Sequence, residues 1–359
     1  MLKHKKNHQE QKKHMQPKPH KTKRFQSLLQ TLLCYRDMST IRVPETEPSA
    51  VEDCRKLKKA FKGWGTDERA AIRILGCRNA KQRSTISRTY QQLYTESLIE
   101  ALESELSGDF GKAMILLAME PSERDAKLAR EAVKRYGEDR YACVLVEVAC
   151  ASSAEHLVAV RRCYCSLFGA SIEEDVGYQF CKQQPLAMLL MSLVSSYRYE
   201  NGECVDDELA KSEAAALRGA IVNKQVEQDG VTQIVATRNK DQLKATFRHY
   251  KQAYGTNFDE DIRSCGGNKR YTTLLQEAIW CLETPEKHFA KVIRDSVVGL
   301  GTDEDSLTRA IVTRADIDMV KIKEEYIRAY KTTVEDDVIG DTSGYYKEIL
   351  LTLLGSDNM

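Results

Sequence analysis

The sequence predicts an all-α protein built from four repeated helical units. Apolar residues recur at intervals of three or four from Ser49 onward, which is the pattern of a helix with one buried face. A glycine-rich hexapeptide occurs twice, as GWGTDE at residues 63–68 and as GLGTDE at residues 299–304. A short helical motif also returns along the chain, so the whole body is expected to share one architecture.

The first unit shows how the helices divide. An apolar stripe over residues 51–61 predicts a first helix that ends at the glycine turn, and a second helix follows Thr66. Further helices are predicted over residues 81–93 and 98–106. The fifth, over residues 109–119, is apolar on nearly all sides and is therefore expected to be central. Each unit thus has five helices.

The repeated motif gives the number of units. It reads ILGCR at residues 74–78, IVATR at 234–238 and AIVTR at 310–314, with intervals of 160 and 76 residues. One copy is missing from the longer interval, and VEVAC at residues 146–150 fills it. Helical repeats bury one another's faces, so four of them are expected to form one body.

The two glycine turns indicate a cation site. Glycine allows positive φ and outward-facing carbonyls, and we interpret Thr66 and Thr302 as N-caps of the helices that follow. Glu105 lies 42 residues beyond Gly63, and Asp341 lies 42 residues beyond Gly299. Carbonyl oxygens with one carboxylate form the hard-oxygen environment that calcium prefers.

The composition argues against a membrane-spanning protein and against a secreted protein held together by disulfides. The chain is 42% hydrophobic and 30% charged, as in a globular protein with a core, and no apolar run approaches the roughly 18 residues of a membrane-spanning helix. Eleven cysteines among 359 residues, without a secretory segment, do not indicate a disulfide framework. We therefore predict reduced thiols and a cytoplasmic protein.

The charge is divided unevenly. Residues 1–37 contain ten Lys and Arg against two acids, a net charge of +8, so the remainder carries −7. Residues 1–38 are predicted to be a disordered basic extension. The extension could favour anionic lipid, serve as a nuclear address, or be leader sequence ahead of a start at Met38, and we favour the leader. An acidic body needs a cation to bridge it to an anionic surface.

Four helical repeats with matched glycine turns in the first and last resemble the annexin family. The absence of such turns from the middle repeats, together with Trp64 in the first turn, is most similar to the plant branch. The resemblance implies a curved disc of four five-helix repeats with its convex face toward the membrane. The implied repeats are residues 39–121, 122–200, 201–285 and 286–359.

The resemblance also implies the site residues and the partner. Acidic phospholipid would bind in the presence of calcium, and the protein would be peripheral on membranes when calcium rises, with a role in stress responses. Trp64 and Leu300 at the loop tips would contact the membrane. Calcium would be held by the carbonyls of Phe61, Gly63 and Gly65 with the carboxylate of Glu105, by those of Val297, Gly299 and Gly301 with Asp341, and at accessory sites by Thr66 with Glu68 and Thr302 with Glu304.

The middle repeats depart from this pattern. Residues 134–138 (KRYGE) and 218–222 (RGAIV) offer neither two spaced glycines nor a threonine. Asp175 and Asp261 nevertheless lie near the expected carboxylate positions, so calcium binding in repeats 2 and 3 stays open.

The predicted function is calcium-dependent binding to acidic phospholipid, not catalysis. The alternatives are a calcium-independent scaffold that binds F-actin, for which IRI at residues 72–74 is a weak signal, and a weak peroxidase or nucleotidase. A peroxidase would need a histidine where Cys77 stands, and DTSG at residues 341–344 lacks an accompanying phosphate loop. No nucleic-acid partner is expected, and self-association on membranes stays open.

The remaining histidines and two cysteines carry no predicted chemistry. His156, His249 and His288 lie far apart in the sequence and are interpreted as ordinary surface or helix histidines. Cys150 and Cys281 are expected to be buried and unreactive.

Overall fold

The computed structural model describes residues 38–46, 48–62, 65–135, 139–199, 205–299 and 301–356, with the side chains of residues 139 and 140 left out. Within these ranges it contains 20 helices and no strand, which confirms the all-α prediction. The first 37 residues, where the basic extension was predicted, lie outside the described residues.

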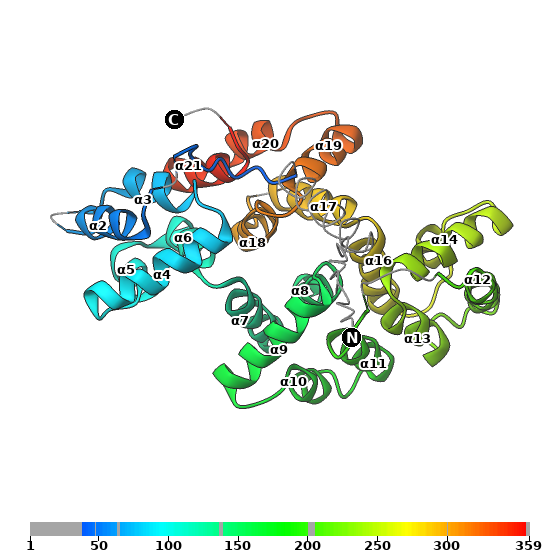
Figure 1. Cartoon of the computed structure of the whole chain (residues 1–359). Helices are drawn as coiled ribbons and strands as arrows, with labels where there is room; N and C mark the ends of the chain where they lie inside the picture. Colours follow the sequence, from blue (N-terminus) through cyan, green and yellow to red (C-terminus); the bar gives the residue numbers. More distant parts are fainter. Residues whose placement is uncertain are drawn as a thin grey trace, which may run out of the picture.

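The helices fall into four groups of five (Figure 1). The first two groups are α2 (Ala50–Ala60), α3 (Glu68–Leu75), α4 (Ala80–Tyr94), α5 (Leu98–Glu105) and α6 (Gly108–Ala118), then α7 (Pro121–Lys134), α8 (Asp139–Cys150), α9 (Ala154–Phe168), α10 (Ile172–Gln179) and α11 (Gln184–Val194). The last two are α12 (Asp207–Val222), α13 (Asp229–Thr237), α14 (Lys240–Tyr254), α15 (Phe258–Ser264) and α16 (Lys269–Glu283), then α17 (Pro285–Val297), α18 (Glu304–Arg314), α19 (Met319–Tyr330), α20 (Val334–Asp341) and α21 (Gly344–Leu353).

Local sequence signals start many of these helices. Ser97 and Ser171 each form a capping box with the glutamate three residues later, and Asn79 forms one with Gln82. Such caps satisfy backbone N–H groups that would otherwise lack a partner. Proline stands in the first turn of α7, α11 and α17, where its missing N–H costs nothing.

Burial divides the four repeats into two halves with separate cores. One core joins α2–α6 to α17–α21, and we call this the 1–4 half. The other core lies within α7–α16, the 2–3 half. Helix α6, predicted to be central, packs against α18 and α21 across the 1–4 half, with Met114 and Leu117 fully buried. Sequence order therefore does not decide which repeats share a core.

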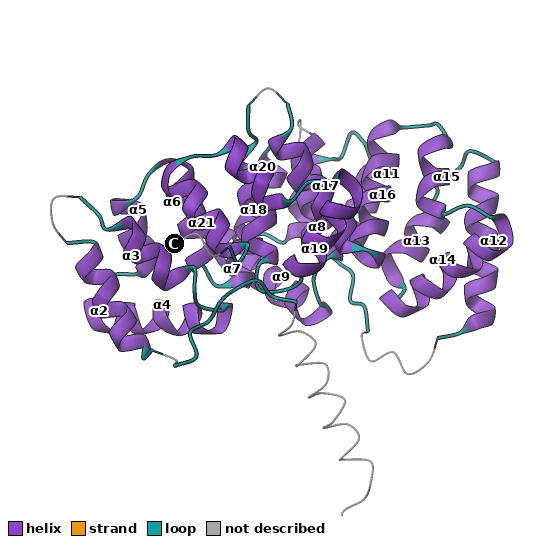
Figure 2. Cartoon of the chain, turned by 90° about the horizontal axis from the view of Figure 1, so that it is seen from above, coloured by secondary structure: helices purple, strands orange, loops and turns teal. Residues whose placement is uncertain are grey.

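Two faces of the molecule can be distinguished. The loops that follow α2, α12 and α17 lie along one edge of the molecule in Figure 2. On the opposite face, Thr40 donates its N–H to the Ala315 carbonyl, 3.0 Å away, and Met38 accepts from the Val320 N–H at 3.1 Å. The segment before α2 is thus bound to repeat 4, at the C-terminal end of α18.

Candidate metal centre

The glycine turn of repeat 1 is closed by the backbone. The Asp67 N–H donates to the Ala60 carbonyl at 2.9 Å, so the chain between α2 and α3 returns to the end of α2. Gly65 has φ +95°, a conformation that side-chain-bearing residues rarely adopt. The predicted positive φ is therefore present at Gly65. Gly63 and Trp64 lie outside the described residues.

The turn brings the predicted carboxylate to the predicted threonine. Thr66 Oγ1 donates to Glu105 Oε2 at 3.1 Å and lies 3.4 Å from the Glu105 carbonyl oxygen. Helix α5 ends at Glu105, so both oxygens of this residue face the turn. Two residues 39 positions apart are thereby joined at one surface point.

Repeat 4 reproduces this arrangement. The Asp303 N–H donates to the Ser296 carbonyl at 2.8 Å, and Gly299 and Gly301 have φ +148° and +83°. Thr302 Oγ1 lies 2.6 Å from Asp341 Oδ2 and 3.1 Å from the Asp341 carbonyl oxygen. The shorter aspartate side chain thus reaches its threonine as closely as Glu105 does. Leu300 lies outside the described residues.

One detail of the prediction is wrong. The N-caps of α3 and α18 are Asp67 and Asp303, whose side chains accept from the N–H groups of Ala70 and Ser306 at 2.9 and 3.2 Å. Thr66 and Thr302 use their hydroxyls on the carboxylates instead. Aspartate is as good an N-cap as threonine, so the preference for a cap could not distinguish neighbouring residues.

The donor set fits a hard cation. Among the described residues, no three His, Cys, Asp or Glu side chains converge as a metal cluster, so any cation here would depend largely on carbonyls. The accessory residues Glu68 and Glu304 line the same cavity of about 440 Å³ as Glu105 and Asp341, between repeats 1 and 4. Phe61 caps α2 and Val297 ends α17, so both backbones border their turns.

Neither of the two predicted ligand carboxylates is neutralised by a basic side chain within the described part of the chain. Glu105 and Asp341 each accept a hydrogen bond from a threonine, and neither makes an ion pair there. Uncompensated carboxylates beside outward carbonyls attract cations. On α20, by contrast, Glu335 and Asp337 pair with Lys323 and Arg294.

The acids of the middle repeats have a different role. Asp175 accepts from Arg130 and, at 2.6 Å, from the Tyr164 hydroxyl. Asp261 accepts from Arg218 at 2.9 Å and from the Tyr250 hydroxyl at 2.7 Å. Each aspartate is thus held in an Arg–Tyr–Asp triad. The charges of both aspartates are thus compensated within the protein, so neither is a free carboxylate.

The triad of repeat 4 shows which of its residues correspond to those of the other three repeats. Its own triad is Arg294, Tyr326 and Asp337, one helical turn before Asp341. Asp175 and Asp261 therefore correspond to Asp337, and the residues that correspond to Asp341 in repeats 2 and 3 are Gln179 and Cys265. Repeat 1 has no triad, because Ala101 stands at the aspartate position.

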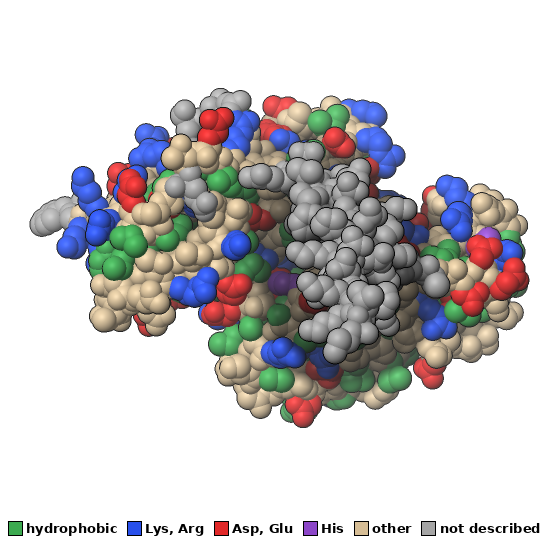
Figure 3. All heavy atoms as spheres, in the orientation of Figure 1, with side chains coloured by type: hydrophobic (Ala, Val, Ile, Leu, Met, Phe, Trp, Pro, Cys, Tyr) green, Lys and Arg blue, Asp and Glu red, His purple; other side chains and the backbone are tan. Residues whose placement is uncertain are grey.

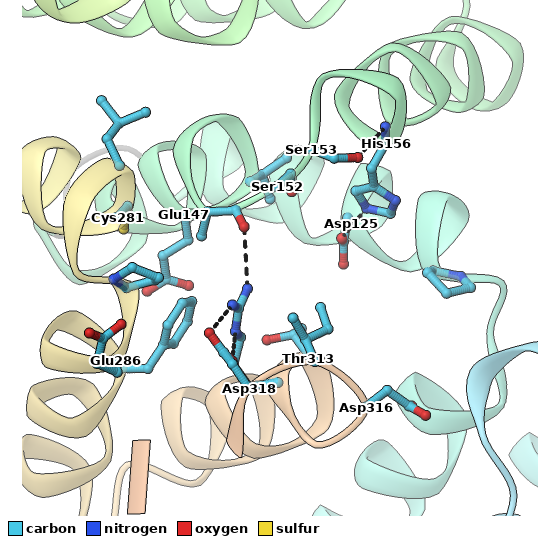
Figure 4. Close-up of a pocket in the computed structure, with 18 of the residues that line it drawn as sticks. Asp125, Glu147, Ser152, Ser153, His156, Cys281, Glu286, Thr313, Asp316 and Asp318 are labelled. Atoms are coloured by element: carbon cyan, nitrogen blue, oxygen red, sulfur yellow. Dashed lines mark hydrogen bonds and ion pairs between the residues drawn. The ribbon is translucent and has the colours of Figure 1, made fainter. Parts of the chain in front are cut away.

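A cavity of about 1230 Å³, lined by both apolar and charged side chains, lies between the two halves (Figure 4). Glu147 and Asp318 face one another across it, with Asp125 and His156 at one end. Glu147 pairs with Arg309 and lies 2.9 Å from His288 Nε2, so one carboxylate of α8 binds two helices of repeat 4. Burial lowers the pKa of His288 to about 4.

Sequence reasoning missed this cluster; His288, interpreted as an ordinary surface or helix histidine, lies on α17 and is 2% exposed. Glu147 lies 141 residues from His288 and 162 from Arg309, so no local pattern connects them. Burial would raise the pKa of Asp125, but Arg124 and His156 outweigh it and lower the pKa to about 2.

Cys150 and Cys281 are buried, as predicted. Burial raises the pKa of both thiols. No helix in the described part of the chain has the length and apolar character to cross a bilayer.

Comparison with known proteins decides the family. The Annexin family model matches residues 52–117, 124–180, 212–275 and 288–353, one segment in each repeat. The chain is a member of the annexin family. Its similarity to plant annexins agrees with the resemblance inferred from the sequence.

The matches extend over nearly the whole of these relatives. Annexin D3 of Arabidopsis thaliana is 48% identical over 322 residues, covering 89% of this chain and 99% of that protein. Annexin Gh1 of Gossypium hirsutum is 44% identical over 317 residues, covering 88% and 99%. Among solved structures, annexin III has a TM-score of 0.81 at 28% identity, covering 89% and 98%. Calcium-bound annexin (Sm)1 has a TM-score of 0.77 at 29% identity, covering 89% and 93%.

Proposed function

We propose that this annexin binds acidic phospholipid membranes in a calcium-dependent manner through the turns of repeats 1 and 4. Its family and fold are those of proteins that generally bind calcium and acidic phospholipids without catalysis. The observation that supports the proposal best is the pair of matched turns, each with an unneutralised carboxylate beside a threonine hydroxyl.

The residues that would hold calcium are those implied by the sequence. The carbonyls of the two turns and the carboxylates of Glu105 and Asp341 are hard oxygen donors, too few to fill the 6–8 positions that calcium prefers. Calcium, when bound, would supply positive charge and open positions for lipid phosphate oxygens. Thr66 and Thr302 hold the carboxylates toward the turns.

Two further residues complete the proposed contact. Trp64 and Leu300 stand between the glycines of each turn in the sequence. A tryptophan at a loop tip is suited to the headgroup region, because its ring is amphipathic. We include both residues as membrane contacts, in a protein that becomes peripheral on the membrane when calcium rises.

Vesicle co-sedimentation tests the proposal. We expect the wild-type protein to sediment with phosphatidylserine-containing vesicles in calcium and to do so less in chelator. The double variant Glu105→Gln/Asp341→Asn should require about tenfold more calcium, because each site loses its only carboxylate.

The matched control is Glu103→Gln/Asp336→Asn. Both control residues are exposed acids on the same two helices, so this variant loses the same charge. An equal calcium requirement in the two double variants would show that the assigned ligands are wrong. Calcium-independent sedimentation of all the proteins would reject the function itself.

A further inference from the structure

A buried tyrosine attaches the start of helix α21 to the start of α18. Tyr346 donates its hydroxyl hydrogen to the Glu304 carbonyl at 3.2 Å, and its oxygen lies 2.8 Å from Thr308 Oγ1. Tyr346 is 8% exposed and Thr308 is 3% exposed, so water has little access to this pair. Because low-dielectric surroundings strengthen a hydrogen bond, the pair fixes the two helix starts relative to each other.

These two helix starts follow the two parts of the proposed calcium site in repeat 4. The turn before α18 carries the predicted carbonyl ligands, and the end of α20, just before α21, carries the Asp341 carboxylate. At the surface, Thr302 already joins the two parts through its hydrogen bond to Asp341. Tyr346 adds a second attachment in the interior and lines the same cavity as Asp341. The carbonyls and the carboxylate are thereby held at two points.

Repeat 1 has the surface attachment but cannot form the interior one. Five residues after the ligand carboxylate, where repeat 4 has Tyr346, repeat 1 has Phe110. The threonine that a tyrosine would meet there is replaced by Ile72. Neither side chain has a hydroxyl, so no hydrogen bond of this kind can form between them. The Phe110 ring instead packs against Tyr345 of repeat 4, with the ring centroids 5.7 Å apart.

Repeat 3 has the same pair of side chains without a predicted calcium site. The Tyr271 hydroxyl on α16 lies 3.0 Å from Thr232 Oγ1 on α13, and both residues are buried. Cys265 stands at the ligand position of this repeat, so no carboxylate is present there. The tyrosine–threonine pair thus occurs in both repeats, but only repeat 4 combines it with a ligand carboxylate.

Surface charge does not distinguish repeats 1 and 4 in this way. On the face drawn in Figure 3, basic and acidic side chains are interspersed among the described residues of both repeats. The interior attachment does distinguish them, so it is the feature that we relate to calcium.

We propose that Tyr346 is a positioning residue for calcium in repeat 4. By holding the start of α18 against the start of α21, it keeps the turn carbonyls and the Asp341 carboxylate at the spacing that one cation requires. Rigidity is one of the properties that set the affinity of a calcium site. The inference rests on the proposed function, because Tyr346 has this role only if repeat 4 binds calcium.

The experiment examines each calcium site alone. Glu105→Gln leaves the site of repeat 4, and Asp341→Asn leaves the site of repeat 1. Tyr346→Phe is added to each protein, and the calcium concentration for half-maximal sedimentation with phosphatidylserine vesicles is measured. In the Glu105→Gln protein this concentration should rise about fivefold, the value of one hydrogen bond. In the Asp341→Asn protein it should not change, because the Tyr346 hydroxyl bonds to residues of repeat 4.

The matched control is Tyr271→Phe, which removes the same hydroxyl from the tyrosine–threonine pair of repeat 3. Added to the Glu105→Gln protein, it should leave the calcium requirement unchanged. Both Phe variants lose a buried hydrogen bond, so their melting temperatures without calcium should fall by similar amounts. Circular dichroism would show that both are folded. The control therefore separates a loss of positioning from a general loss of stability.

Three results would overturn this inference and keep the proposed function. They are an unchanged calcium requirement when Tyr346→Phe is added to the Glu105→Gln protein, an equal rise in both single-site proteins, and an equal rise with Tyr271→Phe. Loss of all calcium-dependent binding from the Glu105→Gln protein would reject repeat 4 as a site, and the role of Tyr346 with it. If the wild-type protein gained nothing from calcium, the proposed function would fail as well.

Discussion

The 1–4 half and the 2–3 half have the same helices but different surface chemistry. In the 1–4 half, Glu105 and Asp341 face glycine turns and have no basic partner among the described residues. In the 2–3 half, the corresponding residues are Gln179 and Cys265, neither of which has a carboxylate. Shared cores therefore group repeats that have the same type of turn.

The comparison also separates structural acids from ligand acids. Asp175, Asp261 and Asp337 are each held by an arginine and a tyrosine, which compensate the charge within the protein. Glu105 and Asp341 lack that compensation. A basic partner therefore separates these three aspartates from the two proposed calcium ligands.

Separate cores predict separable unfolding, the largest effect expected. Leu117 in α6 and Leu193 in α11 are both fully buried, one in each half. Either Leu→Ala change should lower the free energy of unfolding by about 2–5 kcal/mol. Trp280 lies in the 2–3 half, so in a Trp64→Phe background its fluorescence should report Leu193→Ala more strongly than Leu117→Ala. Identical transitions for both variants would contradict independent halves.

The triads predict a loss of stability without a loss of calcium response. Asp261→Asn should lower the free energy of unfolding by about 1.5–3 kcal/mol, because Arg218 and Tyr250 lose a charged acceptor. Its calcium requirement in vesicle binding should equal that of the wild-type protein. An increase in that requirement at unchanged stability would make Asp261 a ligand after all.

Asp125, which lines the cavity between the halves, should make part of the free energy of unfolding sensitive to acid. Because the pKa of Asp125 is lowered to about 2 in the folded protein, its stabilisation is complete above about pH 4 and is lost as the pH falls toward 2. The contribution is about 2 kcal/mol. Urea unfolding across this range should show the difference between wild type and Asp125→Asn shrinking with acidification. A difference independent of pH would contradict the assignment.

The smallest predicted effect compares the two calcium turns. Thr66→Val and Thr302→Val each remove a hydroxyl that orients a carboxylate, worth about 0.5–1.5 kcal/mol or a few-fold in calcium requirement. Thr302 should matter more, because its hydrogen bond to Asp341 is 2.6 Å long and partly buried, whereas the hydrogen bond of Thr66 to Glu105 is 3.1 Å long and exposed. Calcium titration of vesicle binding measures both. The reverse order would argue against orientation by the hydroxyl.

Much of the fold was predictable from local patterns. Helix α4 was predicted over residues 81–93 and spans Ala80–Tyr94, because its apolar spacing and its Asn79 cap are both local. The positive φ of Gly65 and Gly301 followed from residue type alone. The boundaries assigned to the four repeats stay a prediction. The choice of Thr66 over Asp67 as the cap was wrong because either residue can cap a helix.

The sequence by itself determined four helical units, two glycine turns and a carboxylate at a fixed offset from each, because these features depend on neighbouring residues and repetition. Only the tertiary structure decided which repeats share a core and which acids are neutralised. Asp337 and Asp341 are one turn apart on the same helix, yet Arg294 reaches only the first. Glu147, His288 and Arg309 meet across more than 140 residues. Such pairings arise from the packing of distant helices, which no local pattern encodes.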